Sequence, residues 1–168
     1  MQVLEQVRAL QLPDCWVAAG FVRNAVWDHL HGYSHSPIAT DVDVIWFDRA
    51  RCEPAVDRQL EALLHDRSPD IDWSVKNQAR MHRRNADVPY ASATEAMRFW
   101  AETATAVAVR LDKDGHCEVA APFGLEDLFA LVLRPTPRFT QGKLGIYNER
   151  LRAKAWHARW PLLRNHPQ

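Results

Sequence analysis

The sequence predicts an α+β fold, also describable as mixed α/β, in which a small mixed sheet is flanked by helices. Short runs rich in Val, Ile and Ala alternate with longer segments whose apolar residues recur at helical spacing. Late in the chain, the turn sequence Lys113-Asp114-Gly115 separates two short apolar runs, as in a β-hairpin. Alternating strands and helices followed by a hairpin predict a sheet with both parallel and antiparallel pairs.

The predicted strands are short apolar runs, several of them bounded by Gly, Pro or Asp. In chain order they cover residues 15–19, 41–47, 71–75, 105–111 and 117–121. The second run begins with the acids Asp41 and Asp43 and then becomes apolar on both faces. We therefore expect a central strand with one polar end, the rest being buried beneath helices.

Helices are predicted where apolar residues recur every three or four positions. These segments are residues 3–11, 22–31, 53–65, 93–102, 124–131 and 146–160, while residues 77–85 are ambiguous. Gly32 is the expected C-cap of the second helix, and Pro135 follows the helix at 124–131. The last helix is basic, which is usual for a solvated face but also suits contact with a polyanion.

Composition restricts the class of protein. The chain has 168 residues, about one domain, and its net charge is zero with His neutral. This balance argues against a protein that coats nucleic acid non-specifically. No apolar run approaches the ~18 residues of a membrane span, so no membrane association is expected. Three cysteines without a CxxC pair fit reduced thiols and a cytoplasmic location.

Asp41 and Asp43 form the most informative pattern in the sequence. Alternate side chains of a strand point to the same face, so these two acids lie on one side with Cα atoms roughly 6.5 Å apart. Two carboxylates so placed repel each other unless a cation lies between them. Mg²⁺ prefers oxygen ligands of this kind, so Asp41 and Asp43 are the predicted metal ligands of a site for one or two ions.

A second pattern precedes the acids. Residues 19–24 read Ala-Gly-Phe-Val-Arg-Asn and lie where a predicted strand ends and a helix opens. A glycine turn into a helix N-terminus offers backbone N–H groups to phosphate, which makes Gly20 a candidate phosphate-binding residue. Arg23, on the first turn, would add charge and bidentate hydrogen bonds. A phosphate-binding turn followed by a metal-binding Asp-x-Asp suggests nucleotide chemistry.

These two motifs resemble known enzymes. Residues 19–24 resemble the Gly-Gly-x-Val-Arg-Asp opening of tRNA-terminal and poly(A) nucleotidyltransferases, and Thr40-Asp41-Val42-Asp43 resembles their paired metal-binding acids. The whole chain also resembles a bacterial family of small nucleotidyltransferase-like proteins, in segments 75–82, 102–107 and 123–129. The resemblance implies a polymerase-β-type nucleotidyltransferase core forming a single domain over residues 1–168. Ala19 departs from the family pattern, because it replaces the first glycine.

The resemblance also implies a third catalytic acid. Asp72 is the best candidate because it lies early in the next predicted strand, and Asp70 shares its face. The alternative is that both are polar residues ending a loop after Pro69. Lys76 belongs to a polar cluster that could bind the nucleotide or the acceptor, or could be a solvated helix face.

The function implied is Mg²⁺-dependent transfer of a nucleotidyl group from an NTP to a hydroxyl acceptor. The length of the chain favours a small molecule or a protein over RNA as acceptor, although nucleic acid stays possible. The alternative is a non-catalytic nucleotide-binding or regulatory module with the same fold. The third acid separates the two hypotheses, because an apolar side chain in its place would favour the binding module.

Overall fold

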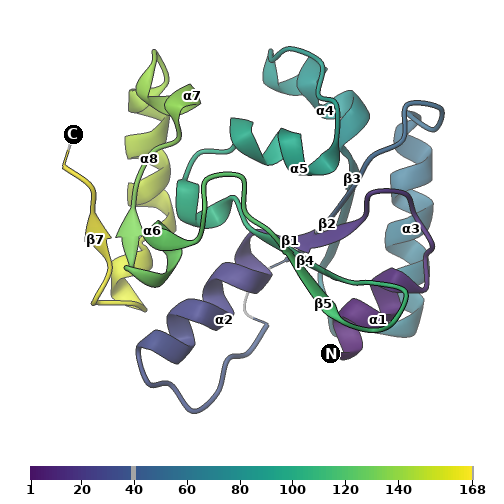
Figure 1. Ribbon diagram of the computed structural model, residues 1–168, viewed down its shortest axis with the longest axis horizontal. Helices are drawn as coiled ribbons and strands as arrows, with labels where there is room; N and C mark the ends of the chain where they lie inside the picture. Colours follow the sequence, from purple (N-terminus) through teal and green to yellow (C-terminus); the bar gives the residue numbers. More distant parts are fainter. Residues whose placement is uncertain (39–40, 168) are drawn as a thin grey trace.

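The computed structural model describes residues 1–38 and 41–167, so Thr40 of the acid motif lies outside the described residues. Within them, one five-stranded sheet has the order β3-β2-β1-β4-β5 (Figure 1). Its strands are β1 (Trp16–Ala18), β2 (Val42–Trp46), β3 (Trp73–Asn77), β4 (Ala108–Leu111) and β5 (Cys117–Ala120). The β2–β3 pair is parallel and the other pairs are antiparallel. The predicted mixed sheet is therefore confirmed.

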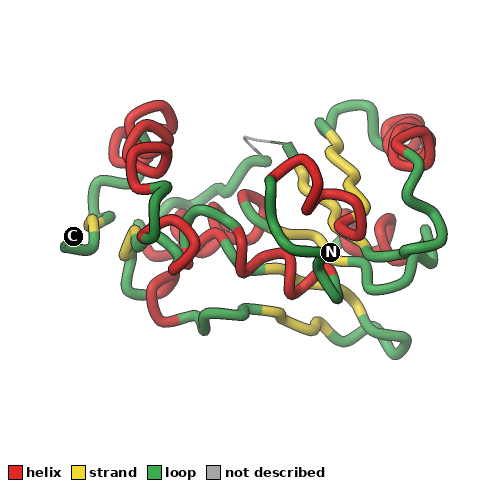
Figure 2. The backbone as a smooth tube through the Cα atoms, turned by 90° about the horizontal axis from the view of Figure 1, so that it is seen from above, coloured by secondary structure: helices red, strands yellow, loops and turns green. Residues whose placement is uncertain are grey.

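Two hydrophobic clusters cover the two faces of this sheet. On one face, α1 (Gln2–Arg8) and α3 (Pro54–Arg67) pack against Val42, Val44 and Trp46. The other face carries Ile45 and Ala18, which pack against α5 (Ala93–Ala96) and the following 3₁₀ turn η1 (Met97–Phe99). Because side chains alternate along β2, Asp43 lies on the same face as Ile45. Helices are seen on both sides of the strands in Figure 2.

A third cluster joins α2 (Gly20–Leu30) to the C-terminal part of the chain. Trp27 of α2 makes edge-to-face contacts with Trp156 and Trp160, with ring centroids 5.7 and 5.1 Å apart. Such pairs contribute about 0.5–1.5 kcal/mol beyond the burial of their area. The C-terminal segments thus lie beside α2, at the end of the molecule opposite α3 (Figure 1).

The remaining elements are short and surround one end of the sheet. They are α4 (Gln78–Asn85), η2 (Thr103–Thr105), α6 (Glu126–Phe129), β6 (Val132–Leu133), α7 (Pro137–Thr140), α8 (Leu144–Lys154), η3 (Trp156–Ala158) and β7 (Arg164–Asn165). β6 and β7 pair in parallel as a small second sheet that the sequence did not predict. Among the described residues, no helix is both long enough and apolar enough to cross a bilayer.

Several predicted boundaries were wrong, and each has a local cause. The basic helix predicted at 146–160 ends at Lys154, because Ala155 adopts a left-handed conformation that turns Trp156 into the core. Residues 103–105 form a 3₁₀ turn, so β4 begins at Ala108 instead of residue 105. The strand predicted at 71–75 lies at 73–77, which leaves Asp72 just before it.

The ambiguous segment at 77–85 is a helix. Asn77 ends β3 and caps α4, because its side-chain oxygen accepts a hydrogen bond from the backbone N–H of Ala79 at 3.0 Å. An Asn cap satisfies one of the N–H groups that a helix start leaves unpaired. The chain therefore passes directly from strand to helix at this point.

Candidate active site

The turn that the sequence predicts as a phosphate-binding turn lies at the junction of β1 and α2. Ala19 separates the strand from the helix and has φ 53° and ψ −121°, a conformation that suits glycine and strains a residue with a Cβ. Its carbonyl accepts the N–H of Arg23 at 3.0 Å, which closes the first turn of α2. The N–H groups that precede Arg23, beginning with buried Gly20, have no partner within the helix.

Asp43 lies beside this turn. It pairs in register with Ala18 of β1, two residues before α2 begins, and with Ser74 of β3. Burial raises the pKa of Asp43 to about 6, and the negative charge of Asp41 adds to the increase. A hydrogen bond from Ser74 opposes it. The half-buried carboxylate of Asp43 is thus held at an energetic cost that a bound cation would remove.

Asp41 and Asp72 lie where the two parallel strands begin. Asp41 is exposed and directly precedes β2, while Asp72 is exposed and directly precedes β3. The backbone carbonyl of Asp72 accepts the N–H of Val42 at 2.7 Å, which continues the ladder. The pairing of Val42 with Trp73 therefore places Asp72 level with Asp41. By contrast, Asp70 lies in the turn before Ile71, outside the strand.

The carboxylates of Asp41, Asp43 and Asp72 do not form a compact cluster. Within residues 1–38 and 41–167, three potential ligand side chains lie within 4.8 Å of one another only at the group of Asp112, Asp114 and His116. That group belongs to the β4–β5 hairpin, where Asp112 accepts the backbone N–H groups of the other two residues at 2.8 Å each. These hydrogen bonds stabilise the hairpin turn, and they account for the proximity of the three side chains without a metal ion.

Arg23 occupies a different environment from the one expected. It is only 4% exposed, and its guanidinium lies 5.0 Å from the ring centroid of Trp27 and 4.5 Å from that of Trp156. Its Nη1 donates to Thr105 Oγ1 and its Nη2 to Asn24 Oδ1, both at 2.9 Å. The bidentate phosphate contact suggested by the sequence stays a prediction, because Nη1 and Nη2 already donate to protein groups while Nε has no hydrogen-bond partner among the described residues.

Arg23 interacts electrostatically with the acids of the site. Burial lowers the pKa of Arg23 to about 10, and the negative charges of Glu102, Asp43 and Asp41 oppose that decrease. At neutral pH the guanidinium is therefore charged. It is a buried cation close to the paired carboxylates.

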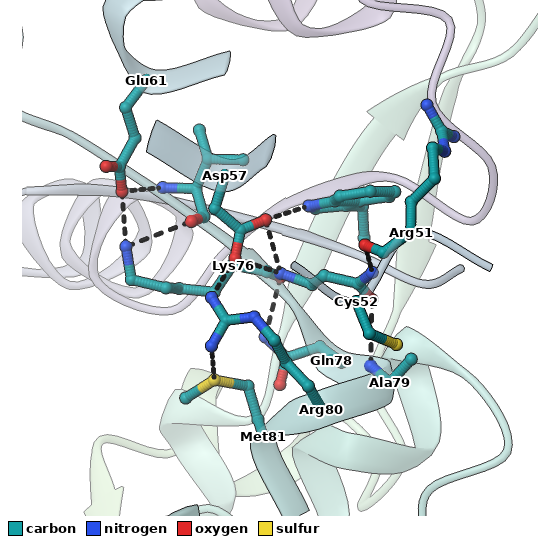
Figure 3. Close-up of polar contacts among 12 residues, drawn as sticks. Arg51, Cys52, Asp57, Glu61, Lys76, Gln78, Ala79, Arg80 and Met81 are labelled. Carbon is teal, nitrogen blue, oxygen red and sulfur yellow. Dashed lines mark hydrogen bonds and ion pairs between the residues drawn. The ribbon is translucent and has the colours of Figure 1, made fainter. Parts of the chain in front are cut away.

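Lys76 lies on β3, at the edge of the sheet. Its Nζ forms an ion pair with Glu61 of α3 and donates to the carbonyl of Val75 at 3.1 Å (Figure 3). Its positive charge also helps to lower the pKa of Asp43. Lys76 thus lines the same cleft as Asp43, with its ammonium group already paired.

Beside Lys76, a buried acid that sequence reasoning missed organises the end of the sheet. Asp57 of α3 is 2% exposed and accepts the indole N–H of Trp46 at 2.8 Å and the backbone N–H of Asn77 at 3.1 Å. It also pairs with Arg80 (Figure 3). These contacts fix the start of α4, and so position Gln78 in the cleft wall. In the sequence Asp57 looked like an ordinary helix residue.

The cleft itself has a volume of about 380 Å³ and extends from Asp43 to α8. Asp43 and Ser74 are among its polar residues, and Trp100, Phe139 and Ile146 supply apolar walls. Two further lining residues, Glu102 and Arg150, were not predicted as site residues. Glu102 is fully buried and accepts from Arg150 Nε at 2.7 Å. For Glu102 the signals in the sequence were its place at the start of the resembling segment 102–107 and an acid preceding the small apolar run at 104–109.

A helix N-terminus beside paired acids on a small mixed sheet defines the class of a nucleotide-transferring enzyme. The chain belongs to the nucleotidyltransferase family, whose model matches residues 5–165, and it is an enzyme of this class. The predicted resemblance is therefore confirmed. None of the curated proteins matches the sequence.

Solved structures agree with this assignment. One, described as revealing a CCA-adding enzyme head domain, is 36% identical with a TM-score of 0.89 and covers 100% of this chain and 89% of that chain. The Thermotoga maritima CCA-adding enzyme complexed with tRNA is 16% identical with a TM-score of 0.60, over 99% of this chain and 38% of that chain. A tRNA-processing enzyme with CTP is 19% identical with a TM-score of 0.55, over 98% and 43%. The last two show the shared fold, and this chain spans less than half of their length.

Proposed function

We propose that this protein catalyses the Mg²⁺-dependent transfer of a nucleotidyl group from an NTP to a hydroxyl acceptor. The observation that carries the proposal is the position of Asp43, which is paired with Ala18 and therefore lies beside the N-terminus of α2. A helix N-terminus favours phosphate, and a carboxylate pair favours a hard cation. Their proximity suits a metal-bound triphosphate.

The donor set fits Mg²⁺. Asp41 and Asp43 supply carboxylate oxygens, and the raised pKa of Asp43 reflects a site that is unfavourable for uncompensated negative charge. We propose that these two residues hold the metal, with room for a second ion beside Asp72. When bound, Mg²⁺ would neutralise the triphosphate and stabilise the attacking and leaving oxygens.

The other residues of the site bind, orient or move protons. The backbone N–H groups of α2 from Gly20 onward would hold phosphate oxygens, and Arg23 would add positive charge from beneath. Asp72, level with Asp41, is proposed as the group that takes the proton of the acceptor hydroxyl. Lys76, which borders the cleft, would contribute positive potential to the nucleotide.

The donor is proposed to be an NTP, because structural neighbours are described with CTP and with tRNA. The acceptor is proposed as a small molecule or a protein hydroxyl, with an RNA end as the competing candidate. We further propose that residues 1–168 act as one domain, and that the protein works in the cytoplasm, which suits its free cysteines.

A non-catalytic nucleotide-binding module is the second candidate. The observation that favours it is the exposed position of Asp72 just before β3, outside any compact group with the paired acids. A module of this kind would bind NTP with Mg²⁺ but would not release pyrophosphate.

Calorimetric titration with each NTP, with and without Mg²⁺, tests the site. We expect Mg²⁺-dependent binding that Asp43→Asn abolishes and that Asp66→Asn, an exposed acid on α3, leaves unchanged. Equal loss in both variants, or no loss in Asp43→Asn, would refute the site.

A pyrophosphate-release assay then separates the two candidate functions. We would supply pooled metabolites, protein or RNA as acceptors and compare wild type with Asp72→Asn. Release that depends on Asp72 supports the enzyme. Tight binding without release from any acceptor supports the module.

A further inference from the structure

Arg23 is a cation that cannot leave its position. Its guanidinium packs against the rings of Trp27 and Trp156, which contact each other edge to face, and it donates to Thr105 and Asn24. A guanidinium does not lose its proton at neutral pH, so Arg23 stays positively charged, and its contacts hold that charge in place.

This fixed charge lies under the acid end of the cleft. Thr105, which accepts from Arg23, lines the same cleft as Asp43. Arg23 is in the first turn of α2, and the strand that leads into this helix pairs with Asp43 through Ala18. The side chain is nine-tenths buried or more, so solvent and salt screen it little.

We propose that Arg23 is a positioning residue that partly neutralises Asp41 and Asp43 in advance, so that free Mg²⁺ binds weakly and tight metal binding requires the polyphosphate of a nucleotide. This inference rests on the proposed function. In this proposal Arg23 does not contact phosphate directly, and its positive charge acts on the metal site through space.

The sign of the effect follows from the charges. A divalent cation bound to Asp41 and Asp43 is repelled by the guanidinium of Arg23. This repulsion is substantial in a partly buried site, because the effective dielectric constant there is lower than in water. A nucleoside triphosphate brings several negative charges that outweigh the single charge of Arg23. Metal and nucleotide therefore favour each other's binding, as thermodynamic linkage requires.

Glu102 carries a negative charge near Arg23, so substitution of Glu102 changes the net charge that acts on the metal site. It is fully buried, its Oε1 accepts from Arg150, and its Oε2 has no hydrogen-bond partner among the described residues. Glu102 offsets part of the charge of Arg23. Removing the negative charge of Glu102 should therefore change metal affinity in the direction opposite to removing Arg23.

Binding of Mn²⁺, followed by electron paramagnetic resonance, tests the proposal. In Arg23→Met we expect the affinity for Mn²⁺ alone to rise about tenfold or more, and the further gain on adding a non-hydrolysable NTP to shrink. The matched control Arg58→Met removes an exposed charge from α3, across the sheet, and should change neither quantity. Glu102→Gln keeps the shape of the side chain and should weaken Mn²⁺ binding severalfold.

The outcomes separate this proposal from the proposed function. Unchanged Mn²⁺ affinity in Arg23→Met, with weakened nucleotide binding, would make Arg23 a direct phosphate ligand and overturn the inference alone. Should Arg23→Met not fold, as judged by near-UV circular dichroism, Glu102→Gln decides, and unchanged affinity there overturns the inference. Absence of Mn²⁺ binding to wild type even with NTP overturns both proposals.

Discussion

Asp43 lies directly opposite Ser74 in the parallel pair of β2 and β3, and the Ser74 side chain hydrogen-bonds to the Asp43 carboxylate. Ser74, together with the positive charges of Arg23 and Lys76, does not compensate for burial and for the negative charge of Asp41, because the pKa of Asp43 rises to about 6. The site thus stores unfavourable electrostatic energy in the absence of a ligand, as functional sites often do.

The first prediction concerns stability. The pKa of Asp43 is about 6 in the folded state against 3.8 for an ordinary aspartate, so ionisation of Asp43 destabilises the fold, and the full penalty is present above pH 6. The penalty decreases as the pH falls from 6 toward 3.8, and it is absent below the pKa that Asp43 has in the unfolded chain. Asp43→Asn should therefore raise the free energy of unfolding at pH 7.5 by about 1–2 kcal/mol, after allowance for partial solvent screening. Urea denaturation at pH 7.5 and pH 4 would measure this.

The same comparison needs a control for a general loss of negative charge. Asp66→Asn, on an exposed position of α3, should change stability by less than about 0.5 kcal/mol at either pH. A gain in Asp43→Asn that is the same at both pH values would contradict the assigned origin.

The second prediction concerns ligand binding and pH. Metal binding requires the ionised carboxylate, so the affinity for Mg²⁺ with NTP should fall as pH decreases below about 6. In calorimetry near pH 6, binding should release a fraction of a proton, detectable as a dependence of the measured enthalpy on the buffer. Affinity that stays constant between pH 5 and pH 8 would argue against Asp43 as a ligand.

The third prediction concerns Ala19. Its φ of 53° is costly for a residue with a Cβ, and glycine adopts it without strain. We expect Ala19→Gly to stabilise the protein by about 0.5–1 kcal/mol, the relief of strain outweighing the extra freedom of the unfolded chain. Ala18→Gly, one residue earlier in β1, should destabilise instead. Thermal unfolding of the two variants gives the comparison, and effects of the same sign would contradict the strain argument.

The fourth prediction concerns the buried acid of α3. Asp57→Ala leaves the Trp46 indole, the backbone N–H of Asn77 and the Arg80 guanidinium without their acceptor, so we expect a loss of about 3–5 kcal/mol in the free energy of unfolding. The exposed pair of Arg51 with Asp48 offers a contrast, since Arg51→Ala should cost less than about 1 kcal/mol. Similar losses in both variants, measured by denaturant unfolding, would be inconsistent with the central role given to Asp57.

Local patterns were enough to predict the mixed sheet and the acid pair. Alternation along a strand depends only on the backbone, so it placed Asp41 and Asp43 on one side without knowledge of the neighbours. The turn at Gly20 is likewise a short-range feature, because a strand must end and a helix must begin within a few residues. The assignment to the nucleotidyltransferase family, which these two motifs suggested, is confirmed.

The environment of Arg23 could not be predicted in this way. Its neighbours Thr105 and Trp156 lie far along the chain. Thr105 precedes β4, which pairs with β1, and Trp156 follows the end of α8 at Lys154, where the turn packs onto α2. The same is true of Glu102 and Arg150, which are separated by 48 residues. Hydrophobic periodicity contains no information about which distant segments share a cluster.

The sequence by itself therefore determined the type of most main elements, the mixed sheet and the two motifs that point to nucleotide chemistry, because each depends on residues close together in the chain. Tertiary structure alone decided that Asp72 lies level with Asp41, that Arg23 is buried against two tryptophans, and that Asp57 anchors the start of α4. These relationships follow from strand register and side-chain packing, which are set by the whole core and not by any one segment.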